Sequence, residues 1–220
     1  MNCPNRVYRT MKNKIKIPES AIRRLSLYHR HLASLQSLGV ETISSREIAT
    51  VYGLAPFQVR KDLSYFGTFG HRGRGYSIIK LREKIGKILG LDRARTMALV
   101  GAGNIGMAVF RYQELRSQGF KIAAVFDSDP KKIGKKLESG VVVKSLDQIP
   151  SEVQKLGIEL GVLAVPSEAA QAAADSLTAA GVKAILCFPS GQINVPKDVA
   201  VKRVNLGVDL ETLSYFLANR

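Results

Sequence analysis

One stretch of the sequence decides the fold of its C-terminal part, and it reads Met97-Ala98-Leu99-Val100-Gly101-Ala102-Gly103-Asn104-Ile105-Gly106. Its apolar half predicts a buried strand, and glycines at GxGxxG spacing follow directly, before a helical pattern. In this context Gly101 permits a tight turn, Gly103 lets the backbone approach a pyrophosphate, and Gly106 lets helix and strand pack closely. The stretch therefore predicts a dinucleotide site in which phosphate charge lies at a helix N-terminus.

An acidic residue, Asp127, ends the next predicted strand, 122–126. A carboxylate in this place accepts hydrogen bonds from both hydroxyls of an adenosine ribose. Ser128 and Asp129 follow without an arginine that would favour a 2′-phosphate, so we expect NADH and NAD+ as ligands. The alternative is a glycine turn and a helix-capping aspartate without a ligand. The cofactor contacts expected from both segments are Gly101, Ala102, Gly103, Asn104, Ile105, Gly106 and Asp127.

The rest of the C-terminal part alternates apolar strands with helical patterns. Strands are predicted at 97–100, 122–126, 160–165 and 184–188, and helices at 105–117, from 130 onward and at 167–180. Apolar strands between helices are typical of a parallel sheet covered on both faces. We therefore predict an α/β chain with a Rossmann domain at 91–204 and an amphipathic C-terminal helix within 205–220.

The N-terminal part carries the pattern of a winged helix-turn-helix domain. Helices are predicted from Pro18 to Leu38, from Ser45 as an N-cap, and from Ala55 to Phe66. Glycines among aromatic and basic residues then predict a β-hairpin wing at 67–78, followed by a connecting helix at 80–89. We assign this domain to 18–90 and expect the polar, basic residues 1–17 to form a flexible arm.

The positive charge is concentrated in this N-terminal part. Of a net charge of +15, the first 95 residues hold 19 Lys and Arg against 6 Asp and Glu, and the remainder holds 14 against 12. A domain this basic indicates a polyanionic partner, and a solvated face that aids solubility is the alternative. No segment approaches the ~20 apolar residues of a spanning helix. Without a secretory signal pattern, we expect a cytoplasmic protein that does not contact membranes.

The third predicted helix presents side chains suited to double-stranded DNA. If Val59, Leu63 and Phe66 face the core, its polar residues point elsewhere. Arginine and lysine bond guanine, glutamine bonds adenine, and serine or tyrosine bonds phosphate. Arginines in the wing suit the minor groove or phosphates. The DNA contacts expected are Gln58, Arg60, Lys61, Ser64, Tyr65, Arg72 and Arg74.

No catalytic or metal site is evident in the sequence. A dehydrogenase needs a second domain that presents an acid or base to the nicotinamide, and no histidine follows His71. The cofactor therefore looks like a ligand to be sensed. Two rival hypotheses remain: a small NAD(H)-dependent oxidoreductase with a basic appendage, and an architectural DNA-binding protein whose Rossmann half serves only dimerisation.

Taken together, the two halves resemble the Rex family of redox-sensing transcriptional repressors, from about Ile17 to Leu217. The resemblance rests on Arg60-Lys61-Asp62-Leu63-Ser64-Tyr65-Phe66-Gly67, Arg72-Gly73, Gly75-Tyr76, Val100 to Gly106, Ala164-Val165-Pro166 and Phe188-Pro189. It implies a homodimer that binds an operator with inverted half-sites when NADH is scarce and releases it when NADH binds. It also implies that the C-terminal helix is domain-swapped and that Phe188 reaches the partner's nicotinamide region. Ala164, Val165, Pro166 and Pro189 join the expected cofactor contacts.

The resemblance further implies a polar switch network. Arg24 in the first helix and Tyr112 after the glycine motif match two family positions, and Asn205 stands where the family carries an aspartate. An amide still accepts a hydrogen bond from Arg24 but lacks charge assistance, which weakens the link. We expect Cys187, beside Phe188, to be a buried and inert thiol.

Overall fold

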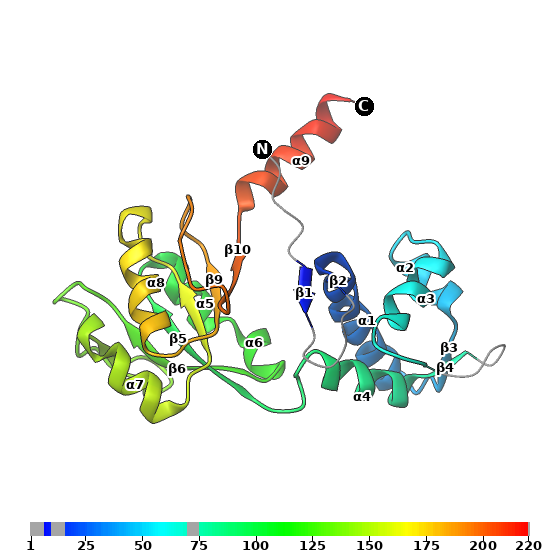
Figure 1. Ribbon diagram of the computed structural model, residues 1–220, viewed down its shortest axis with the longest axis horizontal. Helices are drawn as coiled ribbons and strands as arrows, with labels where there is room; N and C mark the ends of the chain where they lie inside the picture. Colours follow the sequence, from blue (N-terminus) through cyan, green and yellow to red (C-terminus); the bar gives the residue numbers. More distant parts are fainter. Residues whose placement is uncertain (1–6, 10–15, 70–74, 220) are drawn as a thin grey trace. The chain divides into compact units, whose positions relative to one another are not determined.

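The computed structural model describes residues 7–9, 16–69 and 75–219, and the chain divides into two compact units, Met1–Arg93 and Ala94–Arg220 (Figure 1). The division lies close to the domain boundary predicted after residue 90. Each unit has a hydrophobic core of its own. The two units are therefore described separately.

Among its described residues, the N-terminal unit has four helices, which share one core, and two small sheets. Its helices are α1 (Glu19–Ser37), α2 (Ser45–Val51), α3 (Pro56–Ser64) and α4 (Ile78–Ile88). Its strands are β1 (Val7–Arg9), β2 (Lys16–Pro18), β3 (Thr42–Ile43) and β4 (Tyr76–Ser77), and both pairs, β1 with β2 and β3 with β4, are antiparallel. Each helix contributes buried side chains to the core, among them Leu25, Ile48, Leu63 and Ile85.

Local chemistry sets where these helices begin and end. The N-cap of α2 is Ser44 and not the predicted Ser45, because the Ser44 hydroxyl accepts from Glu47 N while Glu47 Oε2 accepts from Ser44 N. This reciprocal capping box satisfies two backbone donors at once. Pro56 fits the first turn of α3, where a missing N–H costs nothing, and Gly39, with φ 75°, follows the end of α1.

Two expectations at the margins of this unit differ from the structure. The arm predicted to be flexible contains Val7–Arg9, which pairs with Lys16–Pro18, so strand hydrogen bonds hold part of it in place. The strand that leaves the predicted wing, β4, pairs with β3, a two-residue strand that the sequence pattern did not reveal. Residues 70–74, the tip of the predicted wing, lie outside the described residues.

The C-terminal unit is built on a six-stranded parallel sheet. Its strands are β5 (Arg95–Val100), β6 (Phe120–Phe126), β7 (Val143–Lys144), β8 (Leu160–Leu163), β9 (Ala184–Cys187) and β10 (Ala200–Arg203). They lie in the order β10-β9-β8-β5-β6-β7, and every pairing is parallel. Its helices are α5 (Asn104–Arg111), α6 (Gln113–Ser117), α7 (Ile149–Leu156), α8 (Ala170–Ala179) and α9 (Leu206–Ala218), with short 3-10 turns η1 (Leu146–Gln148) and η2 (Ser167–Ala169).

Both faces of this sheet are buried. In β5, Ala98 and Val100 belong to a cluster that includes side chains of α7 and α8, whereas Met97 and Leu99 belong to a second cluster that includes Phe110 of α5. Successive residues of a strand point to opposite faces, so a strand covered on both sides must be apolar throughout. This explains the uninterrupted apolar runs in the sequence and confirms the predicted α/β fold class.

Other predicted elements of this unit need correction. The helix expected at 105–117 is interrupted at Tyr112, whose extended ψ of 98° separates α5 from α6. The helix expected from 130 onward is wrong: turns follow Pro130, and Gly134 and Gly140 take φ of 84° and 81°, which a helix does not allow. The helix of this region, α7, begins later, and β7 and β10 were not predicted.

Candidate nucleotide site and nucleic-acid interface

The glycine loop after β5 is shaped by close backbone contacts. Gly101 has φ 100°, and a Cβ there would lie 2.4 Å from the carbonyl oxygen of Ala164. A Cβ on Gly106 would lie 1.8 Å from the carbonyl oxygen of Gly101. A Cβ on Gly103, in contrast, would meet nothing within 4 Å. Gly101 and Gly106 thus allow close contacts between backbone segments that a Cβ would prevent. Gly103 leaves open space beside the N-terminus of α5, as the binding of a pyrophosphate requires.

The order of the strands places this loop at a topological switch point. The chain adds β6 and β7 on one side of β5, then crosses to add β8, β9 and β10 on the other side. In such sheets ligands bind outside the carboxyl ends of the strands where the order reverses. The loop Gly101–Gly106 follows β5, and Ala164 follows its neighbour β8, with Ala164 N donating to Val100 O at 2.8 Å. The predicted nucleotide loop therefore lies where the fold expects a ligand.

The carboxylate of Asp127 stands at the end of β6, beside this loop. Its Oδ2 accepts from Ala102 N at 2.7 Å and from Lys132 Nζ at 3.1 Å, and its Oδ1 accepts from Asp129 N at 2.8 Å. Burial alone would raise the pKa of Asp127, but these hydrogen bonds and the charge of Lys132 outweigh it and lower the pKa. The carboxylate is therefore held as an anion beside the glycine loop, and its contact with a ribose stays a prediction.

The remaining predicted cofactor residues lie at the same edge of the sheet. Ala164 and Val165, both half-buried, adjoin Gly101, and Pro166 is exposed before η2. Phe188 follows β9, donates its N–H to Leu163 O at 3.0 Å and packs partly buried against the cluster around Leu99. Asn104 and Ile105 are exposed in the first turn of α5, and Pro189 is buried. The structure brings all these segments to one edge; their contact with a cofactor stays a prediction.

The thiol of Cys187 is fully buried in β9. Burial raises its pKa, although the charge of Arg203 acts in the opposite direction. A thiol in this state carries little thiolate, so Cys187 behaves as a small apolar side chain.

On α3 the predicted DNA contacts separate into two groups. Arg60, Lys61 and Ser64 are exposed, whereas Tyr65 and Gln58 are half-buried. Ser64 Oγ donates to Lys61 O at 2.7 Å within the helix. Gln58 Nε2 donates to Asp62 Oδ1 at 2.8 Å, so part of its amide is engaged inside the domain. Arg72 and Arg74, the predicted wing contacts, lie outside the described residues.

A hollow of about 570 Å³ lies between the N-terminal ends of α2 and α3. Arg60 crosses it, with Nη1 donating to Ser45 Oγ at 3.1 Å. The sequence analysis did not single out Arg46 or Phe57, although Arg46 lies in the first turn of α2, two residues after the N-cap Ser44, a signal that could have revealed it. Two arginines beside two helix N-termini form a surface that favours phosphate. The hollow is lined by Ser44, Ser45, Arg46, Pro56, Phe57 and Arg60.

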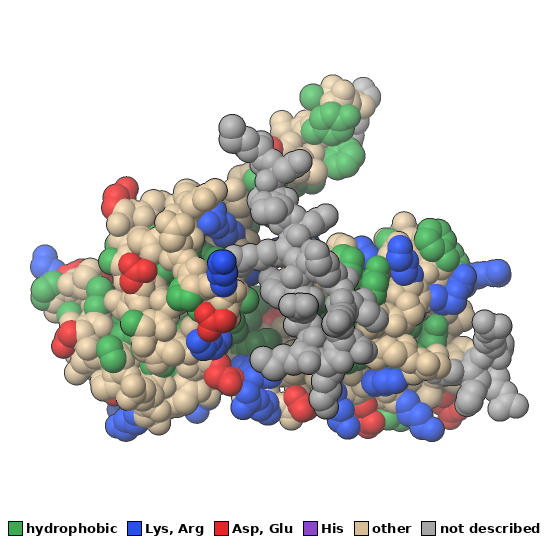
Figure 2. All heavy atoms as spheres, viewed as in Figure 1, with side chains coloured by type: hydrophobic (Ala, Val, Ile, Leu, Met, Phe, Trp, Pro, Cys, Tyr) green, Lys and Arg blue, Asp and Glu red, His purple; other side chains and the backbone are tan. Residues whose placement is uncertain are grey.

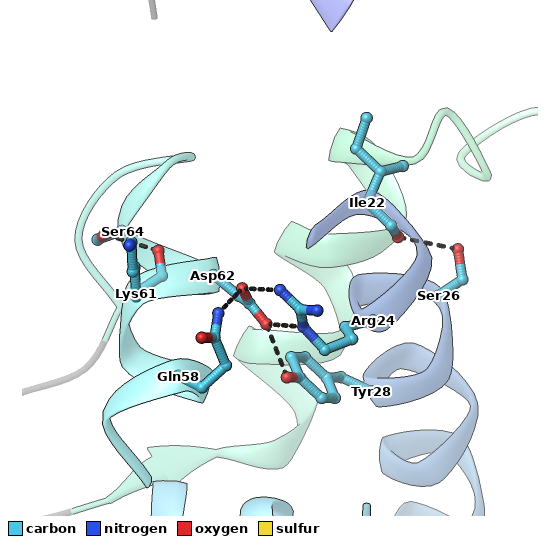
Figure 3. A network of polar contacts seen from close by, with 8 residues as sticks. All are labelled: Ile22, Arg24, Ser26, Tyr28, Gln58, Lys61, Asp62 and Ser64. Atoms are coloured by element: carbon cyan, nitrogen blue, oxygen red, sulfur yellow. Dashed lines mark hydrogen bonds and ion pairs between the residues drawn. The ribbon is translucent and has the colours of Figure 1, made fainter. Parts of the chain in front are cut away.

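A buried polar network fixes α3 against α1 (Figure 3). Asp62 is fully buried, and its carboxylate accepts from Arg24 Nε at 2.6 Å, Arg24 Nη2 at 2.7 Å and Tyr28 OH at 2.9 Å, in addition to Gln58. Lys61 lies on the side of α3 away from α1 (Figure 3). The network therefore sets the rotation of α3 about its own axis and with it the direction in which Lys61 points.

The three residues of the predicted switch network each have a local partner. Arg24 bonds Asp62 in the N-terminal unit. In the C-terminal unit, Tyr112 OH bonds a carboxylate oxygen of Glu114, and Asn205 caps α9 with Oδ1 accepting from Val208 N at 3.3 Å. These local bonds do not test a network that joins all three. It stays a prediction from the resemblance.

The last helix, α9, buries none of its residues. Figure 2 shows hydrophobic side chains gathered along it. Isolated large apolar side chains are common on surfaces, but a whole helix of them is not. The exposed apolar residues are Leu206, Val208, Leu210, Leu213, Tyr215, Phe216 and Leu217, each at least 53% accessible.

Neither a metal site nor a membrane-spanning helix is found in the part of the chain that the structure describes. Among the described residues, no three of the His, Cys, Asp or Glu side chains gather where they could hold a metal ion. Within the same residues, no helix has both the length and the apolar composition to cross a membrane.

Comparisons with known proteins cover both units. A family model described as "Putative DNA-binding protein N-terminus" matches residues 16–64, and one described as "CoA binding domain" matches residues 92–191. The redox-sensing transcriptional repressor Rex of Desulfitobacterium hafniense is 45% identical over 94% of this chain and 98% of that protein. Rex of Syntrophomonas wolfei is 48% identical over 92% and 96%.

Solved structures also match nearly the whole chain. The crystal structure of RSP, a Rex-family repressor, is 36% identical and covers 96% of both chains with a TM-score of 0.85. The complex of RSP with β-NAD+ and operator DNA has a TM-score of 0.87 at 36% identity, covering 96% of this chain and 94% of that one. The complex of RSP with β-NADH has a TM-score of 0.83 at 35% identity, covering 96% of both.

A helix-turn-helix unit followed by a Rossmann unit with an intact glycine loop defines a class of protein in which a DNA-binding domain is joined to a dinucleotide-binding domain. The identity to Rex proteins over nearly the whole chain makes the assignment specific. This chain belongs to the Rex family of redox-sensing transcriptional repressors.

Proposed function

We propose that this protein is a transcriptional repressor that binds operator DNA when NADH is low and releases it when NADH binds. The observation that carries the proposal is the likeness to RSP, which has been crystallised with NAD+ and operator DNA and with NADH, over 96% of this chain. The two candidate sites supply the chemistry that each ligand needs. Both the DNA site and the nucleotide site lie on one chain, as a ligand-controlled repressor requires.

The nucleotide lies at the switch point between β5 and β8. The space beside Gly103 and the N-terminus of α5 take the pyrophosphate, and Asp127 accepts from the adenosine ribose. The nicotinamide extends along this edge of the sheet, and in the dimer Phe188 reaches the nicotinamide region of the partner subunit. An aromatic ring there packs differently against neutral dihydronicotinamide and against its cationic oxidised form, which gives a physical basis for distinguishing them.

DNA binds along α3 and the hollow at its N-terminal end. Lys61 and Ser64 reach the major groove, and Arg46 and Arg60 hold backbone phosphates beside the ends of α2 and α3. Phosphate contacts set the position of the domain, and contacts to base edges read the sequence. The wing residues Arg72 and Arg74 add minor-groove or phosphate contacts.

The functional form is a homodimer on inverted half-sites. The exposed apolar side chains of α9 support this, because a row of large apolar side chains on a surface is typical of a protein–protein contact, and most soluble oligomers are made of identical copies. NADH shifts the dimer toward a closed arrangement only if it binds that arrangement better than NAD+ does. A coupling of about 1–3 kcal/mol changes operator affinity about 5- to 150-fold.

The cofactor is sensed and not turned over. The Rex relatives are named repressors, and a family that regulates transcription acts where bacterial operators are, in the cytoplasm. The rival oxidoreductase predicts steady oxidation of NADH by a carbonyl substrate and no sequence-specific DNA binding. The rival architectural protein predicts DNA binding that ignores NADH.

The test is an electrophoretic mobility shift assay with an inverted-repeat fragment from a promoter near the protein's own coding sequence. Purified protein is titrated onto the fragment, then NADH, NAD+ or NADPH is added at a fixed salt concentration, since protein–DNA affinity depends steeply on salt. We expect release by NADH and retention with NAD+. Retention of the complex at saturating NADH would contradict the proposed function.

A further inference from the structure

Lys132 is a cation inside the site that should bind the adenosine ribose. It lies in the turn after β6, where its backbone N–H donates to Asp129 O at 2.9 Å. Its Nζ lies 3.1 Å from Asp127 Oδ2 and 4.0 Å from Asp129 Oδ2. The Asp127 side chain is 9% accessible, whereas that of Lys132 is 36% accessible. The lysine therefore has room to move, and the aspartate does not.

The hydrogen-bonding capacity of Asp127 is nearly filled by the protein itself. A carboxylate offers about four lone-pair positions. The backbone N–H groups of Ala102 and Asp129 take two, and Lys132 Nζ takes a third. A ribose diol donates two hydrogen bonds, so one position is missing. Since the backbone donors are fixed by the glycine loop and the turn, Lys132 is the donor that must yield.

We propose that Lys132 determines how strictly the site distinguishes NAD(H) from NADP(H), an inference that rests on the proposed NADH-binding function. When the diol occupies Asp127, the ammonium group moves aside but stays tethered beside the ribose. The 2′-phosphate of NADPH brings negative charge against Asp127, which repels it. Lys132 offsets part of that repulsion. It therefore competes with the hydroxyls of NADH and favours the phosphate of NADPH.

Removing the ammonium group has opposite effects on the two cofactors. In Lys132→Met, the ribose diol of NADH meets no competitor, so NADH binds more tightly. NADPH loses the one cation that contacts Asp127 among the described residues, so it binds more weakly. Asp127 stays in place in this variant because both backbone donors remain. General damage to the site would instead weaken both cofactors.

The experiment measures the dissociation constants of NADH and NADPH for the full-length protein by nicotinamide fluorescence at low ionic strength, where exposed charges are least screened. For Lys132→Met we expect the ratio of the NADPH constant to the NADH constant to rise about two- to fivefold, the range of a partly exposed ion pair. Lys132→Arg keeps the cation and should restore a ratio near that of the wild type. Lys135→Met, an exposed lysine of the same segment, removes equal charge and should leave the ratio unchanged.

The possible results separate a failure of the proposed function from a failure of the inference about Lys132. A wild-type protein that binds no NADH would contradict the proposed function and this inference together. If NADH binds and the ratio in Lys132→Met equals that of the wild type, Lys132 has no part in selecting the cofactor. A ratio that rises equally in Lys135→Met would assign the effect to net charge and also overturn the inference.

Discussion

Arg24 on α1 forms a two-pronged ion pair with Asp62 on α3, with Nε 2.6 Å from Oδ2 and Nη2 2.7 Å from Oδ1. The carboxylate is fully buried, and the guanidinium is 23% accessible. Such forked pairs hold both side chains in one geometry. Because Asp62 lies on the same helix as Lys61, a contact deep in the domain sets the direction of a side chain on its surface.

Replacing Arg24 with alanine should destabilise the N-terminal unit. Asp62 would keep hydrogen bonds from Tyr28 and Gln58 but lose its cation, and an uncompensated buried carboxylate costs about 3 kcal/mol. Urea unfolding followed by circular dichroism measures the change. Arg23→Ala is the matched control, since Arg23 is exposed on the same helix and should change stability by less than about 0.5 kcal/mol. Equal stability of the two variants would show that the buried pair contributes nothing.

Lys61→Ala should weaken operator binding without affecting the NADH site. Loss of this exposed contact costs about 1–3 kcal/mol if a base edge is involved, and a lost phosphate contact lowers the salt slope by about one. Fluorescence anisotropy with labelled operator at several salt concentrations measures both quantities. Lys155→Ala, on α7 of the other unit, removes the same charge and serves as control. Identical binding by these two variants would place the DNA surface elsewhere.

The glycine loop and Asp127 could be predicted from the sequence because short-range geometry determines them. Gly101 must adopt a positive φ, and Gly106 must lie against Gly101, so the spacing of the glycines records contacts made within a few residues. Asp127 follows an apolar strand whose end the pattern marks directly. The exposed residues of α3 could be predicted for the same reason, since helical periodicity separates them from Val59 and Leu63.

Two contacts that the sequence did not reveal depend on burial and on backbone conformation, which the pattern of residues does not give. Gln58 has a residue type suited to bases, but its amide bonds Asp62, and Asp62 is held by Arg24 from another helix. Lys132 lies in a segment whose pattern favoured a helix, and only the turn formed there brings its Nζ to Asp127. Both pairs are close in the sequence, four residues apart for Gln58 and Asp62 and five for Lys132 and Asp127, but the burial of Asp62 beside Arg24 and the turn after β6 decide that these contacts form.

Two single substitutions in the glycine loop should separate folding from ligand binding. Gly106→Ala places a Cβ 1.8 Å from the oxygen of Gly101, so we expect the free energy of unfolding of the C-terminal unit to fall by about 3 kcal/mol.

In Gly103→Ala the new Cβ meets no atom within 4 Å, so the variant should fold normally, but its methyl group lies in the space meant for the pyrophosphate. We expect NADH affinity to fall about tenfold, or about 1.4 kcal/mol. Thermal unfolding and nicotinamide fluorescence measure the two effects. Normal NADH binding by Gly103→Ala would show that the phosphates do not approach this residue.

The N-terminal unit should lose stability as the pH falls below about 6.5, and His29 should be one cause. Burial, together with the charge of Arg82, lowers the pKa of His29 in the folded state. Between the folded and unfolded pKa values the unfolded chain therefore binds more protons, so the free energy of unfolding falls with falling pH. Urea unfolding at pH 5.5 and 7.5 should show a smaller difference for His29→Gln than for the wild type. His31→Gln, on the same helix, is the control, and an equal difference in all three proteins would rule out His29 as a cause.

The apolar side chains of α9 should hold the protein as a dimer. Burying one leucine contributes about 2 kcal/mol, and replacing it with aspartate would also bury a charge, so Leu213→Asp should convert dimers to monomers. Sedimentation velocity measures the change, and operator affinity should fall with it because one half-site binds more weakly than two. Glu211→Ala changes a neighbouring exposed residue of α9 and should remain dimeric. If Leu213→Asp sediments as a dimer, another surface forms the interface, and the exposure of α9 needs a different partner.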